Sequence, residues 1–494
     1  SFETLAVQGG TLVLSSNSFE WAGTYQQGGT AVLSLLATTN AVLEARVAAG
    51  DILMELGTTV RLEGESPSRY SFGNRYTNQL LSASNTLTLD EAGVELTAAE
   101  GFAVKEWYQA DNALYAVFDR RSLSDSTNGI AVTKGSQFKK VLDEIDLMSS
   151  DAAARMVDLV FSESVDPTAA DVKEVYGRTV AVPRAMSHFR NGVFRSLSDR
   201  ATERRMLAPF SQRASQAKSG VALEGRGGSL WMKSYSASGS SSQEGETDGY
   251  DLTGVGVMLG SDWMMGEWVM GVAGGACNQT MVMDQAGEYA GAGNHMSGYL
   301  SYGTEGWFFE SSLSVVSASM EYESDGVFTF ETDYGASDMS FYLGTGYMMR
   351  NERSAWIPEI GLLVSSYSQD AAVDTSVDSV PVDMESVSLA SMQMRLGLLG
   401  VFRRPFIGRE LLTQVKARWM NQMSVSEDEV DYKLAGGSDL YQLPLLTPAK
   451  SLLEFGLSAQ LRMNRSFSLL MGFDIESGDG YSANRLIAGL RYNF

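Results

Sequence analysis

Cysteine, histidine and proline are scarce in this chain, and long apolar runs are missing. Among 494 residues there are one cysteine, two histidines and nine prolines. The single cysteine, Cys277, excludes a disulfide within the chain, and so little cysteine is compatible with assembly in an oxidising compartment. Because no run of about 18 apolar residues occurs, a transmembrane helix is not expected.

The two histidines, His188 and His295, offer little material for catalysis. His188 lies in a basic helical stretch, and we interpret the Gly- and Asn-rich segment around His295 as a turn. A Ser/His/Asp site needs a histidine within hydrogen-bond reach of an activated serine, and no nucleophile motif lies near His295. Two distant histidines and one cysteine also give no metal cluster. We therefore expect no enzyme, no catalytic or cofactor-binding residue and no metal.

Basic charge is also in short supply, except in one segment. The chain has 37 basic and 60 acidic residues, a formal net charge of -23, which argues against wrapping nucleic acid. Between Arg184 and Arg226, however, nine basic residues face only three acidic ones. A local reversal of sign this large needs an explanation.

Residues 136–219 are predicted to be helical. Apolar residues recur there at spacings of three and four, at Phe138, Val141, Leu142 and Ile145. Asp166-Pro167 fits an N-cap followed by proline at the first helical position. Pro209 should kink or end any helix that contains it.

From Ser229 onward, the chain alternates apolar and polar residues over long segments. At the C-terminus, one face carries Leu486, Ala488, Leu490, Tyr492 and Phe494, and the other carries Arg485, Gly489, Arg491 and Asn493. This pattern is typical of a strand with lipid on one side and water on the other. Twelve such segments lie near 229–239, 249–263, 267–281, 293–305, 306–320, 335–350, 355–370, 384–402, 410–425, 449–463, 465–478 and 483–494.

These segments run for about 11 to 19 residues, long enough to cross a bilayer at a tilt, which needs roughly 9–11. Strands of a soluble β-sandwich, the alternative, usually run about 5–6 residues. Mean hydropathy is -0.09, which does not exclude a membrane protein, because half of each barrel strand faces the lumen. The sequence therefore predicts a mainly β protein with a 12-stranded antiparallel transmembrane β-barrel.

The first 135 residues have a different texture, with short β-branched runs broken by Gly, Asn and Ser. Gly9-Gly10-Thr11-Leu12-Val13-Leu14 recurs loosely as Gly28-Gly29-Thr30-Ala31-Val32-Leu33, at a spacing of 19 residues. One such period suits one rung of a β-solenoid. Two copies alone leave a solenoid and other β folds equally open.

Taken together, the order of these segments resembles the classical (type Va) autotransporters, over about residues 130–494. Asn128-Gly129 followed by Gly135-Ser136-Gln137 is similar to the start of their helical linker. The barrel-like pieces are Leu230-Trp231-Met232-Lys233, Tyr250 to Asp262, Ser297 to Tyr302, Gly306 to Glu310, Pro358 to Leu362 and Gly489 to Phe494. Trp21-Ala22-Gly23-Thr24-Tyr25 more faintly resembles the stem of a β-helical passenger.

The resemblance implies a three-part chain. Residues 1–135 would be the C-terminal part of a β-helical passenger, 136–228 a helical linker including a lumen helix, and 229–494 an outer-membrane translocator barrel. The barrel would deliver the passenger to the cell surface, aided by the barrel-assembly machinery and periplasmic chaperones. A surface-anchored adhesin using the β-helical segment stays open, as does, less favoured, an outer-membrane hydrolase. Because the chain opens at Ser1 without a signal peptide, we expect a mature or truncated product.

Site residues follow from the same resemblance. A basic helix within residues 185–228 would plug the pore and contact acidic lumen groups; a solvated periplasmic helix is the alternative. The helix residues are Arg190, Arg195, Arg200, Arg204, Arg205 and Arg213, and the lumen residues are Glu310, Glu454, Asp474 and Glu476. Tyr492 and Phe494 would form the assembly signal. Some members cleave the passenger at an Asn pair; here only Asn191, followed by Gly192, is present, and we assign no catalytic residue.

Overall fold

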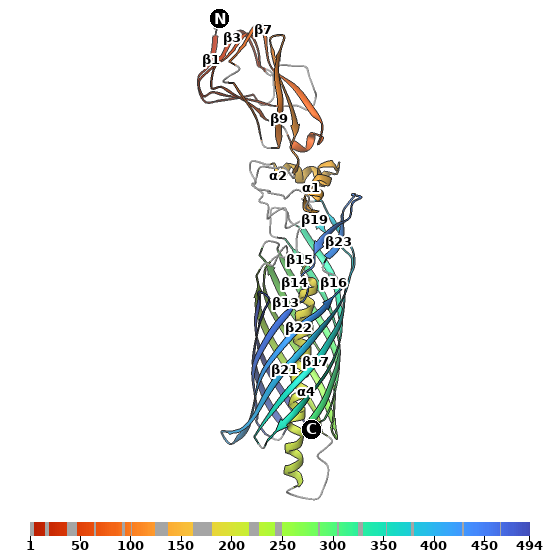
Figure 1. Cartoon of the computed structure of the whole chain (residues 1–494). Coiled ribbons are helices and arrows are strands. Elements are labelled where there is room, and N and C mark those ends of the chain that lie inside the picture. Colours follow the sequence, from red (N-terminus) through yellow and green to blue (C-terminus); the bar gives the residue numbers. More distant parts are fainter. Residues whose placement is uncertain are drawn as a thin grey trace. The chain divides into compact units, whose positions relative to one another are not determined.

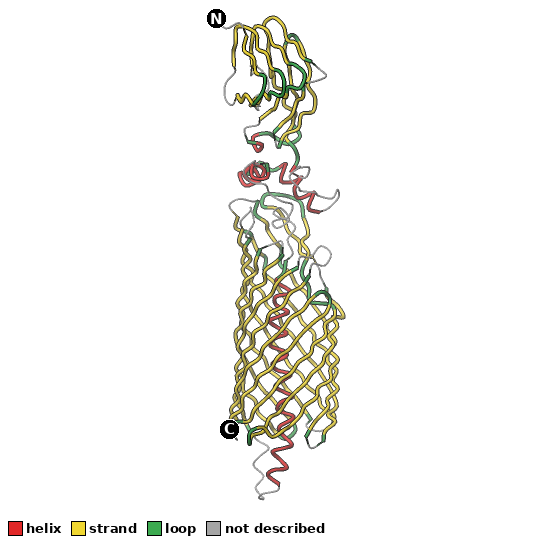
Figure 2. Tube along the Cα trace, turned by 90° about the vertical axis from the view of Figure 1, so that its left-hand side faces the viewer, coloured by secondary structure: helices red, strands yellow, loops and turns green. Residues whose placement is uncertain are grey.

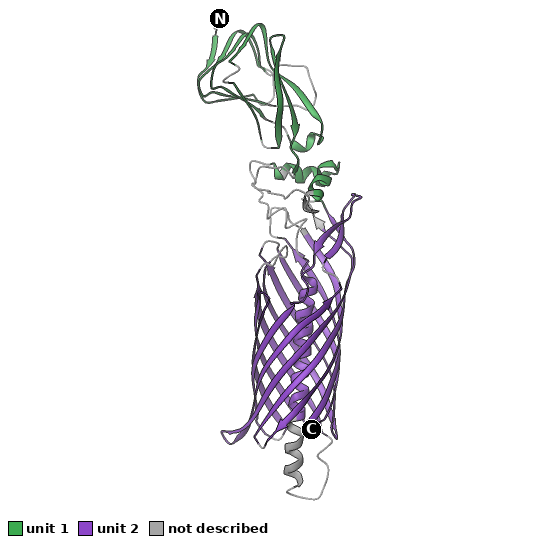
Figure 3. Cartoon of the chain, in the orientation of Figure 1, with its two compact units in different colours: residues 1–172, 377–380 green, residues 173–376, 381–494 purple. Residues whose placement is uncertain are grey.

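The computed structural model describes most of the chain in two compact units. The described residues are 4–14, 19–36, 47–63, 66–90, 94–99, 101–123, 137–161, 180–216, 227–242, 249–284, 287–303, 306–324, 330–351, 353–376, 380–426, 429–464 and 466–494. Unit 1 comprises Ser1–Val172 with Val377–Val380, and unit 2 comprises Lys173–Ser376 with Pro381–Phe494 (Figure 3). Asn128-Gly129, Gly135-Ser136 and Asp166-Pro167 lie outside the described residues.

Unit 1 is β-solenoid-like, because successive turns of the chain add one strand to each of two sheets. One sheet has the order β1 (Thr4–Val7), β3 (Phe19–Gln27), β5 (Val47–Met54), β7 (Arg75–Leu89), β10 (Ala113–Arg120) and β9 (Phe102–Ala110). The other has β2 (Thr11–Leu14), β4 (Val32–Leu36), β6 (Thr59–Glu63) and β8 (Glu95–Ala98). Pairing is parallel throughout, except that β9 and β10 form an antiparallel hairpin against β7.

The 19-residue repeat describes the turns of this unit rather than its strand pairing. Gly10 and Gly29, which the repeat aligns, both have left-handed backbone, with φ of 80° and 65°. A Cβ atom on Gly29 would lie 2.6 Å from the carbonyl oxygen of Gln8, so this turn requires glycine. The strands themselves pair Thr11 with Val32, a separation of 21 residues, so the strand pairing does not follow the 19-residue spacing.

Two helices of unit 1 follow the solenoid, α1 (Gln137–Leu147) and α2 (Asp151–Val160), and a short 3-10 turn, η1 (Pro67–Arg69), precedes β7. In α1 the predicted apolar positions Val141, Leu142 and Ile145 are buried. The carboxylate of Asp146 lies 2.9 Å from Nη1 of Arg120 on β10 and accepts the backbone N–H of Leu123 at 2.8 Å. This buried ion pair fastens α1 to the last strand of the solenoid.

Unit 2 is a closed antiparallel barrel, and helix α4 (Val182–Gln216) runs through it and projects from the end where the C-terminus lies, as both views show (Figures 1 and 2). Its twelve strands are β11 (Gly228–Ser241), β12 (Tyr250–Met265), β13 (Trp268–Met283), β14 (Glu288–Tyr302), β15 (Gly306–Glu323), β16 (Phe330–Arg350), β17 (Ser354–Gln369), β21 (Val387–Phe406), β22 (Arg409–Val425), β25 (Ser451–Arg462), β26 (Phe467–Gly478) and β27 (Tyr481–Asn493). The predicted twelve strands are confirmed; the largest shifts are in the fourth, which starts at Glu288 rather than at residue 293, and in the sixth, which starts at Phe330 rather than at residue 335.

The barrel closes with a constant stagger of its strands. Paired residues can be followed around the barrel from Ser354 on β17 through β21, β22, β25, β26, β27, β11, β12, β13, β14, β15 and β16. The path returns to β17 at Ser368, which is 14 residues further along that strand. For twelve strands this shear corresponds to a tilt of about 40° from the barrel axis. Neighbouring residues in one paired row therefore lie at different depths in the membrane.

The alternation of the sequence separates the two faces of the barrel wall. Leu486, Leu490 and Tyr492 on β27 are exposed on the outside, whereas Arg485 and Arg491 are buried on the lumen side. None of the helices in the described residues has the length and apolar character needed to cross a bilayer.

A small four-stranded sheet lies beyond one end of the barrel, formed by the connections after β17 and β22. Its order is β18 (Ala372–Val373), β20 (Val382–Met384), β23 (Glu429–Leu434) and β24 (Tyr441–Pro444), and β19 (Thr375–Ser376) extends β16. These segments were not predicted as strands, because each is only two to six residues long.

Candidate functional site: the helix-filled lumen

Helix α4 brings a row of arginines into the barrel lumen. Five of them are almost completely buried, namely Arg190, Arg195, Arg200, Arg204 and Arg205. Their spacing along the helix distributes the guanidinium groups around its circumference, so they reach different strands. A buried charge is strongly unfavourable unless a partner neutralises it, and each of these arginines has a carboxylate partner on the wall.

Arg195 contacts two acidic residues on neighbouring strands. It lies 3.7 Å from Glu454 on β25 and also forms an ion pair with Glu476 on β26. Glu454 is shared with Lys416 on β22, at 2.9 Å. The helix is thereby connected to a charge network that runs along the wall.

Arg200 and Arg204 converge on one carboxylate. Nε of Arg200 lies 2.6 Å from Oδ2 of Asp262 on β12, and Nε of Arg204 lies 2.8 Å from Oδ1 of the same side chain. Arg200 also donates to Ser229 at the start of β11. Asp262 has no exposed surface, so this cluster is sealed from solvent.

Arg205 and Arg190 are bound by other parts of the wall. Arg205 lies 2.8 Å from Glu310 on β15 and donates a hydrogen bond to Ser301 at 2.7 Å. Arg190 lies 3.3 Å from Asp338 on β16. The arginines of α4 therefore reach both halves of the barrel circumference.

The opposite arrangement of charges also occurs. Asp199 of α4 lies 3.3 Å from Lys416 and 3.7 Å from Arg418 on β22, and Glu203 lies 3.0 Å from Lys233 on β11. The helix carries both positive and negative side chains, and the wall carries an oppositely charged partner for each kind. Sliding or rotating α4 would therefore place like charges together. These contacts fix its depth and its rotation.

Close packing complements the ion pairs. A Cβ atom on Gly192 would lie 3.0 Å from the Tyr235 ring on β11, so glycine lets the helix lie against this ring. The ring of Phe194 meets Tyr342 edge-on with centroids 4.4 Å apart, and the Arg395 guanidinium lies 3.9 Å from the Phe194 ring centroid. Gly192 therefore has a packing role in the lumen helix.

The chain that leads into α4 is held by the small sheet. The N–H of Val180 donates to Pro444 at 2.9 Å, and the N–H of Leu446 donates to Val180 at 2.9 Å, which forms a parallel bridge. The segment that precedes the helix is thus attached to the connection that follows β24.

The predicted contact residues divide into four groups, one of which, Arg190, Arg200 and Arg204, pairs with wall carboxylates outside the predicted set. The structure brings together Arg195 with Glu454 and Glu476, and Arg205 with Glu310. Asp474 instead pairs with the wall residues Lys416 and Arg485, each at 3.1 Å. The side chain of Arg213 lies outside the described residues.

Sequence reasoning missed several partners of the helix, namely Asp262, Asp338, Lys233, Lys416 and Arg418. Each occupies a lumen-facing position in a strand that alternates, and this alternation was the available signal. Asp262, for example, follows the outward Val255, Val257 and Leu259 at odd positions and continues the inward even ones.

Two expectations about single residues are wrong. His295 lies within strand β14 with its side chain buried in the lumen, and not in a turn, because Gly291 and Gly293 are strand positions filled by Met320 and Ala318 of β15. Pro209 does not end the helix, since α4 continues to Gln216, so of the two predicted outcomes, a kink or an end, the end is wrong.

Among the described residues, the side chain of Asn191 has a hydrogen bond to an arginine and no contact with a carboxylate. Its side-chain oxygen accepts a hydrogen bond from Nη2 of Arg395 at 3.2 Å. We assign no catalytic residue here.

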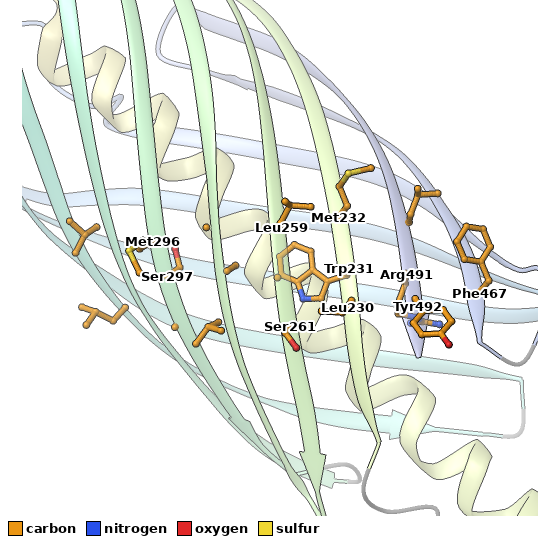
Figure 4. A pocket seen from close by; sticks show the side chains of 18 residues that line it. Leu230, Trp231, Met232, Leu259, Ser261, Met296, Ser297, Phe467, Arg491 and Tyr492 are labelled. Atoms are coloured by element: carbon orange, nitrogen blue, oxygen red, sulfur yellow. The ribbon is translucent and has the colours of Figure 1, made fainter. Parts of the chain in front are cut away.

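The outer face of the barrel is built for a hydrocarbon environment. Leu230, Met232, Leu259 and Met296 border an apolar groove of about 890 Å³ on β11–β15, β26 and β27 (Figure 4). Gly274, Gly298 and Ser261 form part of its floor. Such a face is stable only in contact with lipid chains, so the strands cross a membrane.

Comparisons with known proteins agree with this geometry. Residues 230–474 match the family model described as the autotransporter β-domain. A search of curated proteins gives no match. Solved structures similar to this chain include the translocator domain of autotransporter NalP from Neisseria meningitidis (14% identity, 60% of this chain and 98% of that one, TM-score 0.45). Another is the β-domain of the Bordetella autotransporter BrkA (19% identity, 54% and 100%, TM-score 0.42).

Proposed function

Because residues 230–474 belong to the autotransporter β-domain family, we propose that α4 closes the pore of this translocator and joins it to the end of a β-helical passenger. Membership of the family makes the barrel an outer-membrane protein that exports its passenger to the cell surface. The barrel family is not enzymatic, so the activity of this part of the chain is transport.

The proposed division of the chain has three parts. Residues 1–135 are the C-terminal part of the passenger, 136–228 the linker with the lumen helix, and 229–494 the translocator. The parallel two-sheet arrangement of unit 1 supports the first assignment. The location of α4 inside unit 2 supports the second.

One observation carries the proposal that α4 is a plug. The side chains of Arg195, Arg200 and Arg205 are at most 1% exposed, and each pairs with a wall carboxylate. A helix that merely leaned against the periplasmic face would leave these groups in water, where an ion pair contributes only about 0–1 kcal/mol. Inside the lumen, loss of one partner would leave an uncompensated buried charge.

The orientation follows from export. The N-terminal end of α4 is joined to the passenger side of the chain, so that end of the barrel faces the cell surface. The end where β11 begins and β27 terminates then faces the periplasm. We propose that the barrel-assembly machinery and periplasmic chaperones receive the chain at that end, and that the passenger emerges C-terminal part first.

Protease treatment of intact cells that express the full chain tests the proposed division. External protease should remove residues of unit 1 and leave a protected fragment that begins near Val182 and includes the barrel. Detection of that fragment by mass spectrometry would support the proposal. Protection of unit 1 until the outer membrane is permeabilised, or cleavage within α4 in intact cells, would contradict it.

A further inference from the structure

The hairpin between β21 and β22 extends beyond its neighbours at the periplasmic end of the barrel. The last residue of β21 that pairs with β17 is Phe402, opposite Ser354, and on the other side β22 pairs with β25 only as far as Glu410. The tip is defined here as residues 403–409. Over most of its length it therefore has no paired neighbouring strand on either side. It lies at the same end as the C-terminus, as the register of β22, β25, β26 and β27 requires.

The tip exposes apolar surface in a strained turn. Ile407 has a φ of 49° and Gly408 a φ of 70°, and the side chain of Ile407 is 82% exposed. A left-handed conformation is unfavourable for a β-branched residue. In water this exposed apolar side chain gains nothing that offsets the backbone strain, whereas contact with an apolar surrounding would be favourable.

Aromatic and basic side chains alternate towards this turn on the outward face. Leu398, Phe402, Arg404 and Phe406 occupy alternate positions of β21, and Phe406 pairs in register with Arg409. The row continues the lipid-facing face without interruption, with the ring of Phe402 against Trp356 at a centroid distance of 5.6 Å. The first part of this row contacts lipid chains, and its end must lie at the level of the headgroups.

On the opposite face of the tip, one glutamate pairs with two arginines. Glu410 lies 2.5 Å from Arg403 and 3.6 Å from Arg462. Glu410 therefore pairs with the arginines of that face, whereas Arg404 and Arg409 lie beside the outward aromatic residues. Nη1 of Arg409 also lies 2.7 Å from Sδ of Met463, and its remaining guanidinium N–H groups can donate to a phosphate.

We propose that this hairpin tip is a binding site for an anionic phospholipid of the periplasmic leaflet. Arg404 and Arg409 bind the phosphate, and Phe402, Phe406 and Ile407 contact the glycerol backbone and the upper part of the acyl chains. Guanidinium groups suit phosphate because their donors are planar and remain charged. A lipid is the fitting occupant, because the site continues a surface that already contacts lipid.

Native mass spectrometry of the full refolded chain tests this site. The protein is exchanged from detergent with an equimolar mixture of phosphatidylglycerol and phosphatidylcholine, and the ratio of the two bound lipids is measured. The test variant is Arg404→Gln/Arg409→Gln. The matched control is Arg353→Gln/Arg462→Gln, which removes two arginines at the same end of the barrel but off the outward face of the tip. Heat-modifiable migration on gels verifies that all barrels are folded.

The expected result is a preference for phosphatidylglycerol in the wild type and the control, with an about tenfold loss in the test variant. Glycerophosphoglycerol, which has the headgroup without acyl chains, should not displace the lipid at equal concentration. An unchanged ratio in the test variant, or an equal loss in the control, would overturn the proposal. Displacement by the free headgroup would show that the tip binds phosphate without a lipid, and would also overturn the proposal.

Discussion

Arg200 and Asp262 meet in the barrel lumen with 2.6 Å between Nε and Oδ2, and neither side chain is exposed to solvent. Arg204 binds the second oxygen of the same carboxylate. One aspartate of β12 thus neutralises two arginines of α4. Such an arrangement fixes the helix strongly, because any displacement leaves buried charge without a partner.

Substitution of Asp262 by alanine should destabilise the plugged barrel. Arg200 and Arg204 would keep their charge without this carboxylate, at a cost of about 3–5 kcal/mol. The midpoint of heat-induced unfolding, followed by gel migration, should fall markedly. Asp251→Ala, on the exposed face of the same strand, is the control and should leave it nearly unchanged. An unaltered midpoint for Asp262→Ala would mean that the pair does not hold the helix.

Replacement of Gly192 by leucine should interfere with seating of the helix. The new side chain would collide with the ring of Tyr235, since even a Cβ atom would lie 3.0 Å from it, and overpacking of this kind costs about 1–3 kcal/mol. The double variant Gly192→Leu/Tyr235→Ala should recover part of the loss, as measured by the same heat-induced transition. Equal or greater destabilisation in the double variant would contradict direct packing of the two residues.

Deletion of Phe494 should reduce assembly into the outer membrane. Its N–H donates to the carbonyl of Gly228 at 3.1 Å, and its ring lies against Gly228, so this residue completes the seam between the first and last strands. The amount of folded barrel in outer-membrane fractions should decrease, with Phe406→Ala as a control at a distant hairpin. Normal levels after deletion would argue against a role for Phe494 in assembly.

The junction between the solenoid and α1 should depend on Asp146. Asp146→Ala removes the partner of the buried Arg120 and an acceptor for the N–H of Leu123, and we expect a loss of about 3–5 kcal/mol in the stability of unit 1. Asp143→Ala, at a half-buried site with a long 3.5 Å contact to Ser122, should cost much less. Urea-dependent proteolysis of unit 1 measures the loss of stability in both variants. Similar losses would show that the ion pair with Arg120 does not contribute more than the contact of Asp143.

The sequence permits prediction of the barrel but not of its internal pairs. Period-two alternation identifies all twelve strands, because lipid and lumen impose opposite polarity on successive residues. The partner of each arginine depends on the 14-residue shear and on the depth of α4, which are global properties of the closed barrel. Asp262 and Asp338 were therefore overlooked, although both occupy inward positions of alternating strands.

Local composition was misleading where tertiary packing decides the conformation. Gly291, Gly293 and Asn294 resemble a turn, yet they lie within β14 because side chains of β15 fill the space over the glycines. The small sheet at the barrel end was also not predictable, since strands such as β18 and β20 are too short to show a period.

Single-channel conductance in planar bilayers tests most directly whether α4 closes the pore. The intact chain should be nearly closed, and a chain that begins at Leu230 and so lacks α4 should form an open channel. Equal conductance of the two proteins, with both inserted and folded, would place the basic helix outside the conduction path and contradict the account.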